Sequence, residues 1–159
     1  MHDASQAATP LIRLAALDDR APMLELWERA VRATHHFLDD TKISELRPAV
    51  VDVLASDALQ WWVVETTGGV VGFLGLVANS VEALFIDPAS HGRGIGKLLM
   101  DHAQALNAGS ALLVDVNEDN DGALAFYRRL GFEVVGRSAT DADGRPYPLL
   151  HMRREPLSS

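Results

Sequence analysis

The chain has 159 residues, and its 14 Lys and Arg against 22 Asp and Glu give a formal net charge of −8. A surface that binds nucleic acid is basic, so this balance argues against a polynucleotide partner and suits a cationic amine substrate. Cysteine is absent, which excludes disulfides and a cysteine nucleophile and fits a reducing cytoplasm. The chain has neither an apolar run of about 18 residues nor a secretory pattern at its N-terminus, so we expect a cytoplasmic protein without a membrane span.

This length predicts one folded domain over residues 10–155, preceded by a flexible polar tail over residues 1–9. The order of expected elements, β-α-α-β-β-β-α-β-α-β-β, predicts an α/β fold in which helices flank a mixed sheet. Period-2 and apolar runs predict strands over residues 11–15, 60–66, 70–78, 81–86, 111–116, 132–137 and 147–152. Helical periodicity predicts helices over about 21–34, over 46–54, from 95 to just before 109, and over 123–130. The run over 111–116 is almost continuously apolar, which is typical of a strand covered on both faces.

Three glycines at alternate positions, Gly92, Gly94 and Gly96, stand between a predicted strand and the start of a predicted helix. The first amides of a helix have no intrahelical acceptor, and the helix dipole is positive there, so a loop without side chains can surround a phosphate with N–H donors. Arg93 and Lys97 add positive charge. The pattern favours a phosphate-binding loop, and a plain strand-to-helix turn is the alternative.

The spacing of these glycines excludes two common phosphate loops. A Walker loop would need glycine at position 91 and Ser or Thr at position 98, where the chain has His91 and Leu98. The dinucleotide fingerprint G-x-G-x-x-G would need glycine at Lys97 or Leu99. A nucleotide-binding regulatory domain is therefore a weak alternative.

The loop resembles the acetyl-CoA pyrophosphate loop of the GNAT superfamily of N-acetyltransferases, Arg/Gln-x-x-Gly-x-Gly/Ala. Gly94 and Gly96 match it, and His91 stands at the Arg/Gln position. A second signature follows, similar to the family's Asn-x-x-Ala-x-x-x-Tyr-x-x-x-Gly-Phe element, at Asn120, Ala123, Tyr127, Gly131 and Phe132. The expected element order is also that of the family, and short stretches such as 83–88 and 144–150 resemble its YjaB-type bacterial members.

The resemblance implies acetyl-CoA as the donor and assigns its binding residues. The pyrophosphate would lie on the loop formed by His91, Gly92, Arg93, Gly94, Ile95, Gly96 and Lys97, with the contact of the His91 side chain left open. The pantetheine arm would lie along the strand over 81–86, where backbone N–H groups near Phe85 and Ile86 would hold the thioester oxygen. Asn120 would contact the arm or the pyrophosphate, or cap the following helix, or both.

Tyr127 matches the family tyrosine that contacts the donor and gives a proton to the leaving thiolate. Its unperturbed phenol pKa of about 10 keeps it protonated at neutral pH. For the base that accepts the amine proton the candidate is Glu82 at the head of the central strand, and an exposed strand acid without a catalytic role is the alternative. His35 and His36, in the connection that borders the acceptor site in such folds, are substrate contacts or a second candidate base.

The remaining expectations concern cofactors, mechanism and partners. No metal-binding spacing of histidines is present, so we expect no metal. Absence of cysteine and of a G-x-S-x-G serine predicts direct transfer in a ternary complex. The acceptor, a small-molecule or protein amine, stays open, and a non-catalytic acyl-CoA-binding module is the alternative function. Trp61, Trp62 and a strand through residues 146–148 could form an apolar edge for a homodimer.

Overall fold

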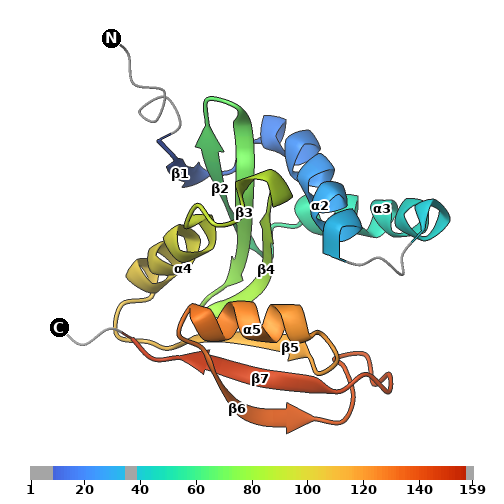
Figure 1. The fold of residues 1–159 in the computed structure, drawn as a ribbon, viewed down its shortest axis with the longest axis vertical. Helices are drawn as coiled ribbons and strands as arrows, with labels where there is room; N and C mark the ends of the chain where they lie inside the picture. The colour runs from blue at the N-terminus through green and yellow to red at the C-terminus, as the bar shows by residue number, and fades with distance from the viewer. Residues whose placement is uncertain (1–8, 35–38, 157–159) are drawn as a thin grey trace. The chain divides into compact units, whose positions relative to one another are not determined.

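The structure, a computed structural model, describes residues 9–34 and 39–156 of the chain. Its elements follow the predicted order, with two 3₁₀ turns added, η1 (Leu17–Asp19) and η2 (Pro88–Ser90) (Figure 1). The helices are α2 (Arg20–Thr34), α3 (Asp40–Leu54), α4 (Ile95–Leu106) and α5 (Asp121–Arg129). The strands are β1 (Leu11–Leu14), β2 (Gln60–Thr66), β3 (Gly69–Val77), β4 (Ser80–Ile86), β5 (Leu112–Asn117), β6 (Glu133–Ser138) and β7 (Leu149–Arg154).

The strands form a seven-stranded sheet with the order β1-β2-β3-β4-β5-β7-β6. β4 runs parallel to β5, whereas β1 is antiparallel to β2 and β7 is antiparallel to both β5 and β6. The predicted α/β class with a mixed sheet flanked by helices is therefore confirmed.

The described chain divides into two compact units. The first holds the described residues up to Gly75 together with Ala83–Leu99. The second holds Leu76–Glu82 together with the described residues from Met100 onward. β3, β4 and α4 each contribute residues to both units.

The core of the first unit lies between α2, α3 and one face of the central strands. Trp61, Val63 and Phe73 point from β2 and β3 into this core, and the rings of Trp61 and Phe73 lie 5.9 Å apart. The helices supply the other buried members, Met23, Leu26, Trp27, Ala30, Val31, Ile43 and Leu54. The expectation that Trp61 lies on an apolar edge is wrong, because the alternation of β2 turns this residue inward, leaving it 9% exposed.

In the second unit, β5 alternates strictly between buried and exposed residues. Leu112, Val114 and Val116 are buried, whereas Leu113 is 39% exposed and Asp115 is exposed. The expectation that this strand is covered on both faces is therefore wrong. One apolar side chain, Leu113, filled an exposed position and made an alternating strand look continuously apolar.

The ends of most elements differ by one or two residues from the predicted ones, and the shifts of α3 and β7 have a local cause. α3 begins at Asp40, earlier than expected, because the Asp39 side chain caps it by accepting a hydrogen bond from the Lys42 N–H at 2.8 Å. β7 begins at Leu149, so the expected strand through residues 146–148 is wrong. Pro146 and Pro148 have no N–H to donate to a ladder.

Candidate active site

The glycine loop connects β4 to α4 and has the backbone conformation that glycine favours. Gly92 has φ +80° and Gly94 has φ +77°, in the left-handed region where other residues are strained. A Cβ added at either position would meet nothing within 4 Å. Both glycines therefore serve the path of the backbone, and neither is required by close packing.

The loop ends where α4 begins, and Gly94 occupies the cap position. The Leu98 N–H donates to the Gly94 carbonyl at 2.9 Å, which is the first bond of the helix. The amides of Ile95 and Gly96 precede that bond, so they have no acceptor within the helix. His91, Arg93 and Lys97 are exposed. The space beside Gly92 and Gly94 is open, and the N-terminus of α4 is the positive end of the helix dipole. Such a loop fits the diphosphate of acetyl-CoA.

Three hydrogen bonds of Asp87 fix the start of the loop. The Asp87 side chain accepts from the Ala89 N–H at 3.1 Å and from Arg29 of α2 at 2.9 Å. The Asp87 N–H donates to the Val71 carbonyl of β3 at 2.8 Å, which continues the β3–β4 pairing past Ile86. The arginine contact was not predicted, because Arg29 and Asp87 are distant in the sequence.

The first turn of α4 packs directly on β3 at a glycine. A Cβ built on Gly72 would stand 2.9 Å from Ile95 Cγ2 and 3.4 Å from Leu99 Cδ1. Gly72 therefore sets how closely the N-terminus of α4 approaches the strand. This close approach was not predicted, although a glycine inside a strand often marks one.

Phe85 and Ile86, the predicted contacts of the pantetheine arm, lie at the end of β4. The Phe85 ring packs on Phe73 at 5.4 Å, and Ile86 is 8% exposed. Earlier on the same strand, Ser80 and Val81 pair with Leu113 and Val114 of β5. A role for the Phe85 and Ile86 amides stays a prediction.

Tyr127 lies on α5 and is buried between two aromatic rings. Phe126 and Phe132 each lie 5.4 Å from it, edge to face. Burial raises the pKa of the Tyr127 phenol to about 12, because the charged form would lose its hydration. The phenol is therefore protonated at neutral pH, which is the state that a proton donor needs.

Asn120 caps the helix that carries Tyr127. Its Oδ1 accepts from the Ala123 N–H at 3.0 Å, which confirms the capping interpretation. Asp121 in the first turn and Arg128 and Arg129 in the last turn complement the helix dipole. A contact between Asn120 and the donor stays a prediction.

Glu82, the predicted base, is exposed on β4 and accepts a hydrogen bond from the Ser80 hydroxyl at 3.2 Å. Its role as base stays a prediction. His35 and His36, the predicted substrate contacts, lie outside the described residues.

The structure places the candidate residues in two groups. The loop residues 91–97 share the first unit with Phe85 and Ile86, and Glu82 shares the second unit with Asn120 and Tyr127.

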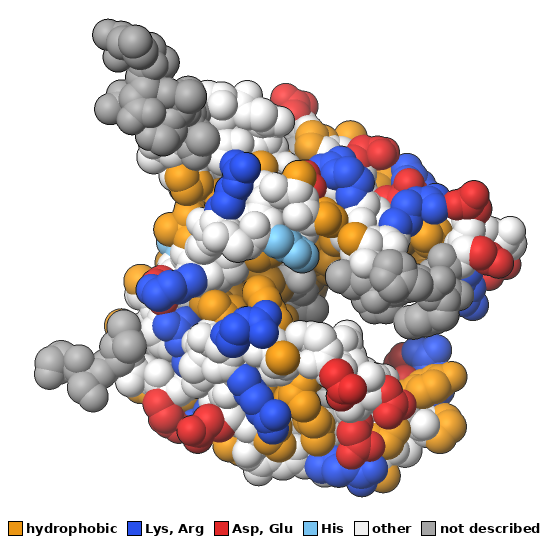
Figure 2. All heavy atoms as spheres, viewed as in Figure 1, with side chains coloured by type: hydrophobic (Ala, Val, Ile, Leu, Met, Phe, Trp, Pro, Cys, Tyr) orange, Lys and Arg blue, Asp and Glu red, His pale blue; other side chains and the backbone are white. Residues whose placement is uncertain are grey.

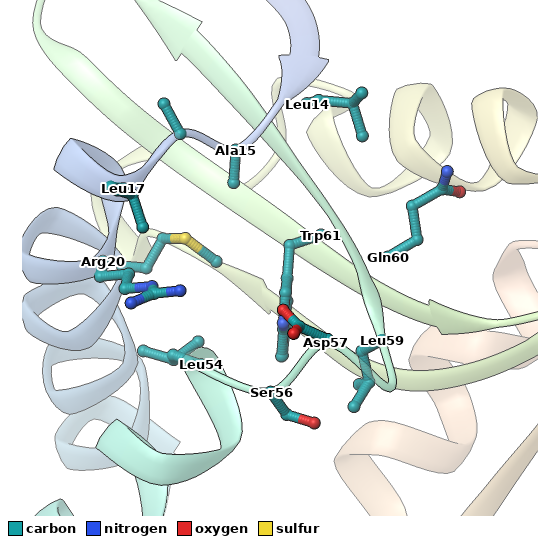
Figure 3. A pocket seen from close by; sticks show the side chains of 12 residues that line it. Leu14, Ala15, Leu17, Arg20, Leu54, Ser56, Asp57, Leu59, Gln60 and Trp61 are labelled. Atoms are coloured by element: carbon teal, nitrogen blue, oxygen red, sulfur yellow. The ribbon is translucent and has the colours of Figure 1, made fainter.

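A pocket of about 500 Å³ also lies in the first unit (Figure 3). It lies between β1, η1, the start of α2, the end of α3 and the start of β2. Side chains that include Leu17, Arg20, Leu54 and Trp61 line it. None of its lining residues belongs to the predicted site, so this pocket is separate from the glycine loop.

The remaining surface observations concern charge, metals and membranes. Basic and acidic side chains are intermixed on the face shown in Figure 2. Within residues 9–34 and 39–156, no group of three or more His, Cys, Asp or Glu side chains could hold a metal ion. In the same part of the chain, no helix is long and apolar enough to cross a membrane. Four expectations stay predictions: that no metal is bound, that no nucleic acid is a partner, that no membrane is a partner, and that the protein is cytoplasmic.

Comparison with known proteins identifies the class. Residues 57–134 match the model of the acetyltransferase (GNAT) domain. The peptidyl-lysine N-acetyltransferase YjaB of Salmonella typhimurium is 42% identical over 141 residues, which make up 89% of this chain and 95% of that protein. The chain therefore belongs to the GNAT family of acetyltransferases, as its glycine loop and second signature predicted.

Solved structures agree with this assignment. The apo form of YjaB from Escherichia coli has a TM-score of 0.78 and 35% identity, covering 91% of this chain and 97% of that chain. The PaiA N-acetyltransferase of Thermoplasma acidophilum, solved in complex with coenzyme A, shares the fold, with a TM-score of 0.71 at 18% identity over 92% of this chain and 99% of that one. The chain is an N-acetyltransferase, and this finding favours the predicted enzyme over a non-catalytic acyl-CoA-binding module or a nucleotide-binding domain.

Proposed function

We propose that this N-acetyltransferase moves an acetyl group from acetyl-CoA directly to the side-chain amine of a lysine in a protein. The lysine acceptor is proposed from the relatives, since the YjaB protein of Salmonella typhimurium carries the name peptidyl-lysine N-acetyltransferase and is covered over 95% of its length. The net charge of −8 suits a cationic acceptor.

The observation that carries the donor assignment is the backbone of Gly92 and Gly94. Two left-handed glycines with open space beside them lead into the N-terminus of α4. In our proposal the amides of residues 92–97 bind the diphosphate, and Arg93 and Lys97 add charge attraction. His91 would contact the diphosphate from the rim of the loop.

The chemical step needs a base, an oxyanion donor and an acid. In the proposal, Glu82 takes a proton from the lysine ammonium through water, and the free amine attacks the thioester carbon. Backbone N–H groups at Phe85 and Ile86 stabilise the charge on the carbonyl oxygen while the new C–N bond forms. As the C–S bond breaks, Tyr127 gives its proton to the sulfur, and the second N–H proton of the former ammonium leaves the nitrogen and restores the phenol. Asn120 holds the helix that carries Tyr127, and His35 and His36 would contact the acceptor.

The acceptor class can be tested with acetyl-CoA and detection of the free thiol. Peptides with an internal lysine and a blocked N-terminus should release CoA, and matched peptides with that lysine replaced by glutamine should not. Peptides with a free N-terminus, spermidine and free amino acids complete the panel. A preference for one of these over lysine peptides would overturn the acceptor proposal and leave the donor proposal in place.

The direct mechanism can be tested by initial-rate kinetics. Varying acetyl-CoA at several fixed peptide concentrations should give intersecting double-reciprocal lines, as a ternary complex requires. Parallel lines would indicate an acyl-enzyme and would contradict direct transfer.

The division into a tail over residues 1–9 and an acetyltransferase domain over 10–155 is also a proposal, as is a homodimer. Removal of residues 1–9 should leave both turnover and the unfolding midpoint unchanged. Sedimentation of the intact chain over a range of concentrations would test self-association.

A further inference from the structure

Three side chains on neighbouring strands of the second unit form a continuous hydrogen-bonded chain. The Ser138 Oγ lies 2.6 Å from His151 Nε2, and His151 Nδ1 lies 2.6 Å from Asp115 Oδ1. β5, β7 and β6, which carry them, lie side by side (Figure 1). None of the three residues belongs to the site proposed above.

The strand register explains why these residues meet. Asp115 stands opposite His151 in the β5–β7 pair, and His151 stands opposite Gly136 in the β6–β7 pair. A Cβ at Gly136 would lie 3.4 Å from His151 Cδ2, so the glycine leaves room for the imidazole to extend across it. Beyond Gly136 on the same strand stands Ser138.

The chemistry of the partners determines the direction of the bonds. An ionised carboxylate only accepts hydrogen bonds, so His151 Nδ1 carries the hydrogen that it shares with Asp115. In a neutral imidazole the other nitrogen is then an acceptor, and His151 Nε2 accepts from the Ser138 hydroxyl. A serine nucleophile, a histidine base and an orienting carboxylate have this order in serine hydrolases of unrelated folds.

The setting of Ser138 allows a small acyl group to approach. Ser138 and His151 are half-buried and Asp115 is exposed. Ser138 ends β6, which is the edge strand of the sheet. The outer side of an edge strand presents N–H groups without a ladder partner, and such donors can stabilise the oxygen of a carbonyl under attack.

We propose that Ser138 is a nucleophile that accepts a small acyl group, such as acetyl, from an activated ester or thioester. The Ser138 hydroxyl proton passes to His151 Nε2 as the Oγ–acyl bond forms. The bond between the acyl carbon and the leaving oxygen or sulfur breaks, and the leaving group takes the proton from His151. Water then repeats the sequence, which releases the carboxylic acid and restores Ser138. Asp115 acts as a positioning residue that holds the histidine in the required tautomer.

The test uses the intact chain with p-nitrophenyl acetate, without acetyl-CoA and without an amine. We expect release of nitrophenolate and one acetyl group on the Ser138 peptide by mass spectrometry. Ser138→Ala and His151→Gln should each lower the enzyme-dependent rate by at least about tenfold, since general-base assistance contributes about 10²–10⁴-fold in enzymes. Ser110→Ala, a change at an exposed serine outside the hydrogen-bonded chain, is the control and should leave the rate unchanged.

The role of Asp115 must be tested by a measurement that separates the reaction rate from the stability of the sheet. Asp115→Asn keeps the shape of the side chain but removes the charge that selects the tautomer, so it should lower the ester rate at an unchanged unfolding midpoint. Asp115→Glu should restore part of the rate.

A second reagent protects the test against misfolded variants. A fluorophosphonate should label Ser138 in the native unmodified chain and not in the urea-unfolded chain. Acetylation confined to lysines or the N-terminus, an unchanged rate in Ser138→Ala, or no labelling of the native chain would overturn the proposal. Because neither experiment contains acetyl-CoA or an amine, their failure would leave the proposed lysine acetylation untouched.

Discussion

Gly72 of β3 lies directly beneath Ile95, the first residue of α4, and a Cβ at Gly72 would stand only 2.9 Å from Ile95 Cγ2. The strand thereby admits the N-terminus of the helix to close range. Because the amides that we assign to the diphosphate belong to this helix end, a residue inside the sheet is connected to donor binding.

We predict that Gly72→Ala shifts the first turn of α4 and weakens acetyl-CoA binding. Overpacking of this kind typically lowers the free energy of unfolding by about 1–3 kcal/mol. Gly75→Ala is the matched control on the same strand, because its Cβ would stand 2.6 Å from the Trp61 ring in the core on the other face. Both variants should lose stability in urea unfolding, but only Gly72→Ala should raise the dissociation constant of acetyl-CoA in calorimetry. Equal affinities in the two variants would contradict the connection.

Substitution of Gly94 tests the loop itself. Gly94→Ala should lower the affinity for acetyl-CoA by roughly tenfold or more, because a left-handed alanine is strained by about 1–2 kcal/mol and its methyl group enters the open space of the loop. Gly144→Ala provides the comparison, since Gly144 has φ +80° and equally open surroundings in another loop. The two variants should lose similar stability, and an unchanged affinity in Gly94→Ala would remove the loop from the donor site.

Tyr127→Phe should lower turnover by about a hundredfold while acetyl-CoA affinity stays nearly constant, because general-acid assistance contributes about 10²–10⁴-fold. The chain offers a matched control in its other tyrosine, Tyr147, which is 53% exposed. Tyr147→Phe should leave turnover at the wild-type level. Wild-type turnover in Tyr127→Phe would exclude the phenol as the acid.

The raised pKa of Tyr127 also predicts a pH dependence of stability. The phenol has a folded-state pKa of about 12 and an unfolded value near 10, so the unfolded chain loses its proton first. The stability contributed by the neutral phenol is complete below about pH 10 and is lost as the pH rises toward 12. Unfolding by urea between these values should therefore show a steeper decline for the wild type than for Tyr127→Phe. Parallel declines would mean that burial does not hold the phenol neutral.

An ion pair near the N-terminus predicts the opposite dependence. Arg13 binds both carboxylate oxygens of the buried Asp19, at 2.6 and 3.0 Å, and these hydrogen bonds hold the pKa of Asp19 below its usual value. This stabilisation is present above the unfolded pKa, near 3.9, and is lost as the pH falls through the folded value. Asp19→Asn should lower the unfolding free energy by about 1–3 kcal/mol at pH 7, with a smaller difference in acid. The exposed neighbour provides the control, since Asp18→Asn should have little effect.

Much of the fold followed from local patterns. The period of β2 predicted its limits correctly, and the alternating glycines marked the start of α4. These signals lie in contiguous residues, because the pitch of a helix, the pleat of a strand and a positive φ are properties of a short segment.

The errors came from neighbours that the sequence does not show. Trp61 looked like an edge residue because its burial depends on α2 and α3, which pack over β2. The run over 111–116 looked buried on both faces because no local signal showed that Leu113 faces outward. The late start of β7 is different, because Pro146 and Pro148, which exclude residues 146–148 from the strand, are visible in the sequence.

From the sequence alone came the order of the elements, the family resemblance and the candidate donor loop, all encoded by residues close together along the chain. Only the tertiary structure decided that Gly72 underlies α4, that Arg29 holds Asp87, and that Ser138, His151 and Asp115 form one hydrogen-bonded chain. The reason is physical: pairing register and packing join residues that are far apart in the chain, and a one-residue slip of β7 would turn His151 away from both Asp115 and Ser138.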